Sequence, residues 1–228
     1  MKPTILVISF VLAFAMIFPL EAKSKPNQRN VTKFDEIQSD FIKAIQRGDL
    51  QTVIISLKRG ADPNLWGNHG VRPLMLAIKA GNQSMVLLLI KKGANIEGGD
   101  IYGRRPLHIA VEAKSQEMVA LLLKAGAKAD SEGGKSTTPL HEAAALGKIQ
   151  IASLLLQHGA KINARNPTGL TPLMFATSNN QIAMAKYLIL HKANLHARDN
   201  FGQTALDAAQ EKKDSKMVEL LKQYLSKK

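Results

Sequence analysis

The amino-acid sequence predicts an all-α protein, a solenoid of about six stacked helix-turn-helix repeats with hairpin loops. Three observations lead to this prediction. A Pro-Leu pair recurs every 33 residues, starting at Pro73, Pro106, Pro139 and Pro172. Alanine keeps the same spacing, at Ala44, Ala77, Ala110, Ala143, Ala176 and Ala209. Aromatic residues make up only 5% of the chain, which favours packing of helix on helix over a sandwich of sheets.

Residues 136–160 show how one unit is expected to fold. Thr138 can cap a helix, and Pro139 suits the first helical position, where no main-chain N–H is needed. The helix LHEAAAL then ends at Gly147, because glycine adopts the left-handed conformation without strain. A second helix, IQIASLLLQH, stops at Gly159 in the same way. Such a pair buries its apolar sides only when copies stack.

These units resemble ankyrin repeats. TPLHEAAALGKIQIASLLLQHGAKIN, at 138–163, is very close to the family pattern, and RPLHIAVEAKSQEMVALLLKAGAKA and TPLMFATSNNQIAMAKYLILHKANL are looser copies. The resemblance covers residues 40–225, with the first unit similar to an N-terminal capping repeat and the last to a C-terminal one. We divide this domain into repeats at 40–64, 65–96, 97–129, 130–163, 164–195 and 196–225.

Several residues depart from the family pattern. Arg72 and Arg105 replace the capping threonine, so these helices are expected to lose a cap worth about 1 kcal/mol. Lysine replaces glycine at helix ends, at Lys114, Lys192 and Lys213. A left-handed residue other than glycine costs roughly 1–2 kcal/mol. We therefore expect the fifth and sixth repeats to form the less stable end.

Residues 1–22, MKPTILVISFVLAFAMIFPLEA, have the layout of a secretory signal peptide. Lys2 precedes an uncharged apolar run, Pro19 ends that run, and cleavage is expected after Ala22. The run is short for a membrane span, which needs about 20 residues, but an uncleaved anchor is the alternative. Residues 23–39 are expected to form a flexible basic lead. We therefore expect an exported protein, periplasmic or secreted, with no stable membrane insertion after cleavage.

The chain is strongly basic, with 31 Lys and Arg against 18 Asp and Glu and a net charge of +13. Such a charge favours acidic partners. The basic residues are spread along the chain, so we interpret them mainly as solubilising helix surfaces. Binding to an anionic polymer or membrane is the alternative function. Nucleic acid is not expected as a partner, because no surface combining aromatic and basic residues is evident.

The sequence offers little for catalysis or metal binding. The absence of cysteine excludes disulfides, thiolate zinc sites and cysteine nucleophiles. His108 and His141 belong to the TPLH-type motif, and the resemblance implies a structural role for them. His191 and His196 are five residues apart, which does not match the spacing of metal-binding helices. We expect no cofactor, no metal and no enzymatic activity.

The resemblance implies that a partner protein docks on the concave face, formed by the hairpin tips and the first helix of each repeat. The expected contact residues at the tips are Asn68, His69, Val71, Ile101, Tyr102, Arg104, Lys135, Thr137, Thr168, Leu170, Asn200, Phe201 and Gln203. Those expected on the first helices are Lys79, Glu112, Ala145, Ser178 and Glu211.

Four of these residues are apolar at positions that are normally exposed, which is typical of interface hot spots: Ile101, Tyr102, Leu170 and Phe201. The alternative is that they pack on adjacent loops. Arg104 and Lys79 would suit an acidic partner. The prediction is a monomeric, non-catalytic module that binds another protein.

Overall fold

The computed structural model describes residues 33–67 and 70–226. This part of the chain forms twelve α-helices and one 3₁₀ turn, η2 (Gly134–Ser136), with no strand. The helices form six consecutive pairs, which confirms the all-α solenoid. The pairs are α1 (Lys33–Arg47) and α2 (Leu50–Lys58), α3 (Pro73–Lys79) and α4 (Gln83–Lys91), α5 (Pro106–Glu112) and α6 (Gln116–Lys124), α7 (Pro139–Ala145) and α8 (Ile149–Gln157), α9 (Pro172–Ser178) and α10 (Ile182–Leu190), and α11 (Ala205–Glu211) and α12 (Ser215–Leu225).

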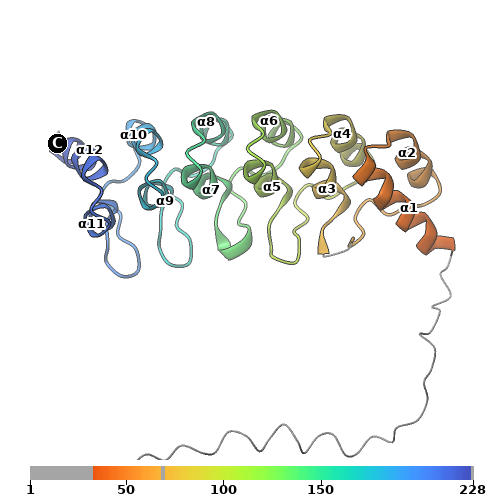
Figure 1. The fold of residues 1–228 in the computed structure, drawn as a ribbon, viewed down its shortest axis with the longest axis horizontal. Helices are drawn as coiled ribbons and strands as arrows, with labels where there is room; N and C mark the ends of the chain where they lie inside the picture. The colour runs from red at the N-terminus through yellow and green to blue at the C-terminus, as the bar shows by residue number, and fades with distance from the viewer. Residues whose placement is uncertain (1–32, 68–69, 227–228) are drawn as a thin grey trace, which may run out of the picture.

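The pairs stand side by side in one row, with the odd-numbered helices in one layer and the even-numbered helices in the other (Figure 1). The hairpin loops project from the odd-numbered layer. The periodic alanines of this layer allow the close stacking: Ala77, Ala110, Ala143 and Ala176 are fully buried. Leucine, methionine and valine from the even-numbered helices fill the space between the layers, for example Leu89, Leu122 and Leu155.

The first helix begins earlier than the sequence predicted. α1 starts at Lys33, so the expectation that 33–39 belongs to a flexible lead is wrong. Ile37 and Phe41, four residues apart, turn into the core, with Ile37 only 8% exposed. Asp35 and Glu36 lie in the first turn, where negative charge suits the helix dipole. The predicted signal peptide and the remainder of the lead lie outside the described residues.

Arg72 and Arg105 have roles that the sequence did not suggest. The Arg72 side chain makes no cap, as predicted, but donates to the main-chain oxygens of Asn64 at 2.7 Å and Gly99 at 3.0 Å. Arg105 repeats this with the oxygens of Glu97 at 2.8 Å and Glu132 at 2.7 Å. Each arginine therefore ties its own repeat to the next, which offsets the lost cap.

A second set of bonds joins consecutive loops, and we call it the loop ladder. Its acceptors stand 33 residues apart, and each accepts the main-chain N–H of the residue 31 positions later. The acceptors are Asn64, Glu97, Asp130 and Asn163, at 2.6, 2.9, 3.2 and 2.8 Å from their donors. Because the ladder uses side chains outside the TPLH-type motif, it fixes the spacing of the repeats independently of it.

The two motif histidines are fully buried and structural, as the resemblance implied. The Nδ1 atom of His141 accepts the N–H of Thr138 at 3.1 Å, so in the neutral ring Nε2 carries the hydrogen and donates to Leu170. His108 is held in the same way between Arg105 and Thr137. Burial lowers the pKa of both rings, which keeps them neutral at pH 7.

The three lysines at glycine positions adopt the left-handed conformation that was predicted. Their φ angles are 57° at Lys114, 70° at Lys192 and 56° at Lys213. Two residues of η2, Lys135 and Ser136, are also left-handed, at 58° and 50°, which the sequence did not suggest. Among the described residues, no helix is both long and apolar enough to cross a bilayer.

Candidate protein interface

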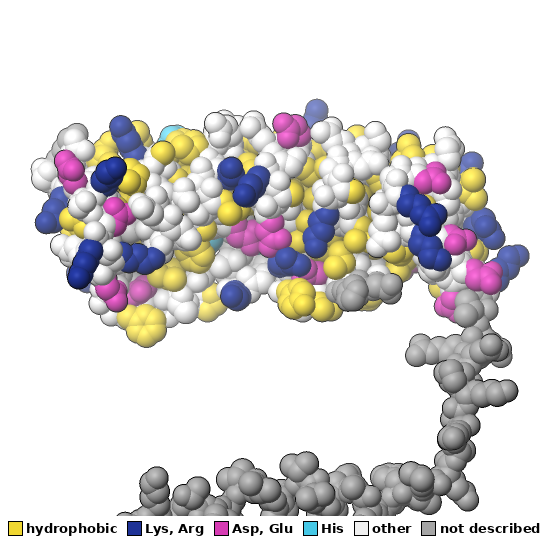
Figure 2. Space-filling model, in the orientation of Figure 1, with side chains coloured by type: hydrophobic (Ala, Val, Ile, Leu, Met, Phe, Trp, Pro, Cys, Tyr) yellow, Lys and Arg dark blue, Asp and Glu magenta, His cyan; other side chains and the backbone are white. Residues whose placement is uncertain are grey.

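Within the described part of the chain, the expected contact residues lie on one side of the solenoid, on the hairpin loops and the odd-numbered helices (Figure 1). We call this side the hairpin face. Asn68 and His69 lie outside the described residues. Apolar side chains appear at hairpin ends along the lower edge of the molecule in Figure 2, while basic and acidic side chains are intermixed above them.

Three apolar hairpin residues are strongly exposed: Ile101 is 60%, Tyr102 67% and Phe201 80% accessible. Leu170 differs, because it is half-buried and packs against the core. Its main-chain oxygen also receives the His141 bond. The expectation of an exposed Leu170 is therefore wrong, and packing on the adjacent loops explains this residue. Thr137 is buried as well, and its main-chain oxygen accepts a hydrogen bond from His108.

Neighbouring hairpin tips are joined through their main chains. The N–H of Ile101 donates to the oxygen of Gly70 at 3.3 Å, and the N–H of Asn200 donates to the oxygen of Thr168 at 3.0 Å. Gly70 has a φ of 65°, and a Cβ atom there would lie 2.1 Å from Cγ2 of Ile101. The tips of the second and third repeats are therefore tied to each other, as are those of the fifth and sixth repeats.

A hollow of about 540 Å³ opens on the hairpin face between the third, fourth and fifth repeats, and we call it the central hollow. Five of its lining residues were predicted as contacts: Tyr102, Arg104, Glu112, Lys135 and Thr137. The other four were not among the expected contacts: Gly134, Glu142, Asn166 and Phe175. Hairpin and helix residues from three separate repeats thus converge at the central hollow.

Arg104 is held by two carboxylates in the central hollow. Its Nε and Nη2 atoms lie 2.9 and 2.8 Å from Oδ2 of Asp100, whose side chain is only 1% exposed. Its Nη1 atom lies 3.0 Å from Oε2 of Glu112. Burial alone would lower the pKa of Arg104, but the bonds and charges of Asp100 and Glu112 outweigh it and raise that pKa. The guanidinium also lies 5.4 Å from the ring of Tyr102.

Glu142, on α7, is the unusual group of the central hollow. Its Oε2 atom is buried and has no hydrogen-bond partner among the described residues. Burial, followed by the charge of Glu112, raises the pKa of Glu142 to about 8, while Arg104 opposes the rise. Glu142 is therefore mostly protonated at pH 7.

The repeat spacing contains a signal that would have identified Glu142. At the corresponding position the first repeat carries Lys43, and the other repeats carry Leu76, Ile109, Phe175 and Ala208. Glu142 is thus a carboxyl at a position that is apolar in every repeat after the first except its own. A polar residue at such a position lowers stability when it is unpaired, so its presence points to a role outside the fold.

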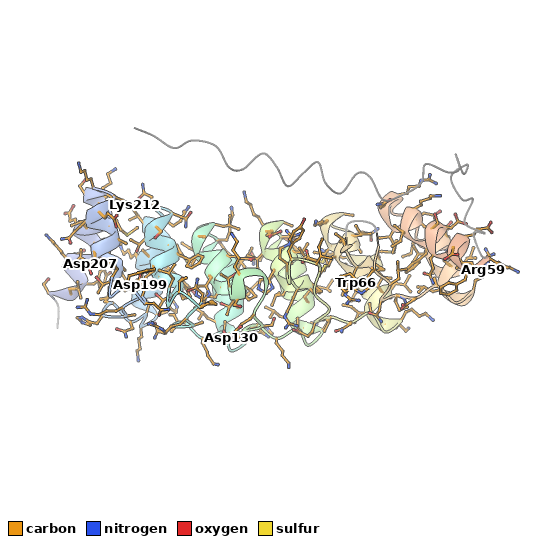
Figure 3. All side chains as sticks on the ribbon, turned by 90° about the horizontal axis from the view of Figure 1, so that it is seen from below. Arg59, Trp66, Asp130, Asp199, Asp207 and Lys212 are labelled. Atoms are coloured by element: carbon orange, nitrogen blue, oxygen red, sulfur yellow. The ribbon has the colours of Figure 1, made fainter. Side chains whose placement is uncertain are left out.

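A second hollow, of about 320 Å³, lies at the N-terminal end of the face, between α1 and the first hairpin. Its lining includes Trp66, the only tryptophan of the chain, which is 54% exposed. The guanidinium carbon of Arg72 lies 4.1 Å from the centre of the Trp66 ring. Figure 3 shows Trp66 near this end and Asp199 toward the other. Trp66 was not among the expected contact residues, although an exposed tryptophan is a common anchor at interfaces.

Residues 33–67 and 70–226 contain no group of three or more His, Cys, Asp or Glu side chains that could hold a metal ion. His191 instead places Nδ1 2.8 Å from the main-chain oxygen of Tyr187 and stacks on the Tyr187 ring.

Comparisons with known proteins agree with this architecture. The family model described as ankyrin repeats (3 copies) matches residues 41–133 and 140–228. A comparison with curated proteins gives no match. The solved structure of a predatory endopeptidase from Bdellovibrio bacteriovorus in complex with an immunity protein contains a similar chain, with 29% identity and a TM-score of 0.73. That match covers 81% of this chain and 97% of the other. Since the family model spans most of the sequence, the chain belongs to the ankyrin-repeat family.

Proposed function

We propose that this protein is a non-catalytic module that binds a partner protein on its hairpin face. The observation that carries the proposal is the position of the exposed apolar tips Tyr102 and Phe201 on the face that also opens into the central hollow. Exposed aromatic residues beside a hollow are typical of interface anchors. The ankyrin-repeat family and the similar chain in a two-protein complex support the proposal.

The partner that we propose to test first is a peptidase. The similar structure is that of an endopeptidase in complex with an immunity protein. The signal-peptide layout of residues 1–22 supports export, so the proposed encounter takes place in the periplasm or outside the cell. The protein would bind as a monomer and hold the peptidase in an inactive complex.

A second candidate function, binding to an anionic polymer or membrane, is favoured by the net charge of +13. The two candidates differ in their response to salt. Binding of basic residues to a polyanion loses affinity steeply as the salt concentration rises, whereas docking of apolar tips does not. Figure 2 shows basic and acidic side chains intermixed on the face in view, which supports protein docking over a uniformly basic surface.

The test compares two double variants. Tyr102→Ala with Phe201→Ala removes the exposed aromatic tips. Ile55→Ala with Leu87→Ala removes two half-exposed apolar residues from the even-numbered layer and serves as the matched control. Each protein is immobilised and exposed to the exported proteins of the source cells, and the retained peptidase is then measured for affinity and activity.

We expect the tip variant to bind the peptidase at least about tenfold more weakly, because anchor residues cost 1.4 kcal/mol or more when truncated. The control variant should bind like the original protein, and the peptidase should lose activity in the complex. Equal binding by both variants would reject the hairpin face as the interface. If the original protein and both variants lose all bound material in 0.5 M salt, binding to an anionic polymer or membrane is favoured instead.

A further inference from the structure

Three carboxyl groups surround the single guanidinium of Arg104, and two of them, Glu112 and Glu142, line the central hollow. Arg104 pairs with both Asp100 and Glu112, at 2.8 and 3.0 Å. Glu142 lies in the same lining, and its buried Oε2 atom has no partner among the described residues. The only other cation of the lining is Lys135, which is exposed on the left-handed turn η2. Oε2 of Glu142 is therefore left without a hydrogen bond, and the one cation that acts on its carboxyl, Arg104, is already paired with Asp100 and Glu112.

We propose that the central hollow receives one basic side chain of the partner protein, an arginine or a lysine, which pairs with Glu142 and Glu112. This inference rests on the proposed function, because it assigns the chemistry of the group that enters the same face. The rings of Tyr102 and Phe175 complete the lining and would contact the side-chain stem and the cation.

The dimensions and chemistry of the central hollow favour this occupant. A hollow of about 540 Å³ has room for one long side chain. An acidic side chain would face the carboxylate of Glu112, and an apolar one would bury Oε2 of Glu142 without a partner. A guanidinium supplies hydrogen bonds to a carboxylate and a flat surface for an aromatic ring.

The overall charge limits what the rest of the partner can be. The chain carries +13, so a broadly basic surface would be repelled at long range. A basic group is therefore recognised locally, as one inserted side chain, within a partner surface that is otherwise neutral or acidic. Glu142 provides this selectivity because none of the equivalent positions, Lys43, Leu76, Ile109, Phe175 and Ala208, carries a carboxyl group.

Binding of a cation should release a proton from Glu142. The pKa of Glu142 is raised to about 8, first by burial and then by Glu112, so the free protein is mostly protonated there at pH 7. A cation favours the ionised carboxylate and lowers that pKa. Affinity should therefore rise as pH increases toward 8 and level off above it. The other titratable or charged groups of the lining are Tyr102, Arg104, Glu112 and Lys135.

The experiment uses two short peptides as probes, Ac-Gly-Arg-Gly-NH₂ and the same peptide with citrulline, which has the shape of arginine but no charge. The side-chain carboxyl of Glu142 is followed by carbon NMR through a pH titration of the full chain. We expect the arginine peptide to lower the titration midpoint of Glu142 by at least about one unit, which corresponds to tenfold preference for the ionised form. The citrulline peptide should leave it unchanged.

Two variants complete the test. Glu142→Gln should lower the affinity for the arginine peptide at least about tenfold at pH 8.5. Glu219→Gln, which removes an exposed carboxylate from α12, changes the net charge equally and should have no effect. Amide NMR spectra will report whether each variant is folded. An arginine peptide that binds both variants alike, or that leaves the Glu142 midpoint in place at tens of millimolar, overturns the inference. The proposed function would survive that result if the tip variant still lost the peptidase.

Discussion

The Nε2 atom of His141 lies 3.0 Å from the main-chain oxygen of Leu170, a residue 29 positions further along the chain. The other ring nitrogen accepts the N–H of Thr138 at 3.1 Å. One buried imidazole thus satisfies a donor in its own repeat and an acceptor in the next. His108 makes the same connection one repeat earlier, with Thr137 as acceptor. The middle of the stack is therefore held by side chains that serve two repeats at once.

Replacing His141 by leucine should destabilise the fold strongly. The change leaves the N–H of Thr138 and the oxygen of Leu170 without partners in a buried place, at a combined cost of about 2–4 kcal/mol. Urea unfolding followed by circular dichroism measures the loss. His158→Leu is the control, because His158 is exposed at the end of α8, and it should change stability by less than about 0.5 kcal/mol. Similar losses in both variants would contradict the role of His141.

Glu142 should make the fold less stable as pH rises. Its folded pKa of about 8 lies above its ordinary value of 4.5, so between these values the unfolded chain is ionised and the folded chain still binds the proton. The free energy of unfolding therefore falls with pH in this window, by at most about 1.4 kcal/mol per unit, and by less because the side chain is partly exposed.

Glu142→Gln removes this dependence. We expect the variant and the original protein to differ little at pH 5, and the variant to be more stable by a few kcal/mol at pH 8.5. Lowered pKa values of His108 and His141 reduce stability below pH 6.5 in both proteins, so they cancel in the comparison. Urea unfolding of both proteins at pH 5 and at pH 8.5 gives the four free energies of unfolding that the comparison needs. A constant difference between the two proteins would mean that the Glu142 carboxyl titrates normally.

Lys192→Gly should stabilise the protein by about 1 kcal/mol, since glycine adopts the φ of 70° without the crowding that a Cβ atom causes. Lys186→Gly provides the matched control. It changes the same residue type in the same repeat, but at an exposed position within α10, where glycine costs about 1 kcal/mol. The two changes should therefore shift the thermal midpoint in opposite directions. A decrease in both would show that Lys192 is not strained.

The C-terminal third of the solenoid should exchange its amide hydrogens faster than the middle. Lys192 and Lys213 are left-handed there, and α11 has few apolar residues to bury. The middle repeats, by contrast, have a neighbour on each side and contain both motif histidines. Hydrogen exchange measured by mass spectrometry resolves the repeats separately. Slowest exchange in residues 196–225 would reject this order of stability.

The fold could be predicted almost completely from the sequence, because the repeat is fixed by residues with local physical roles. Pro139 starts a helix, Gly147 ends it, and Ala143 allows the next helix to approach, as the structure confirms. The start at Lys33 was missed because a capping helix has no TPLH-type motif to mark it. The arginine contacts of Arg72 were missed because their acceptors are main-chain oxygens, which no side-chain pattern reveals.

The interface was only partly predictable. Tyr102, Arg104 and Glu112 were selected because they occupy variable positions, and the structure places all three in the central hollow. Glu142 was missed because it lies inside the TPLHEAA motif, and the residues of this motif were interpreted as structural. Leu170 was wrongly expected to be exposed, because the loop it belongs to folds back onto His141.

The loop ladder has a consequence for how the length of this chain can change. Every rung joins a side chain to the residue 31 positions later, and the rungs themselves are 33 positions apart. Adding or losing a few residues between an acceptor and its donor would change the spacing of 31 and break that rung. Duplication or loss of a whole 33-residue block brings each donor back to an equivalent acceptor. Heritable changes in the size of this protein are therefore expected in steps of one complete repeat, each step lengthening or shortening the binding face by one hairpin.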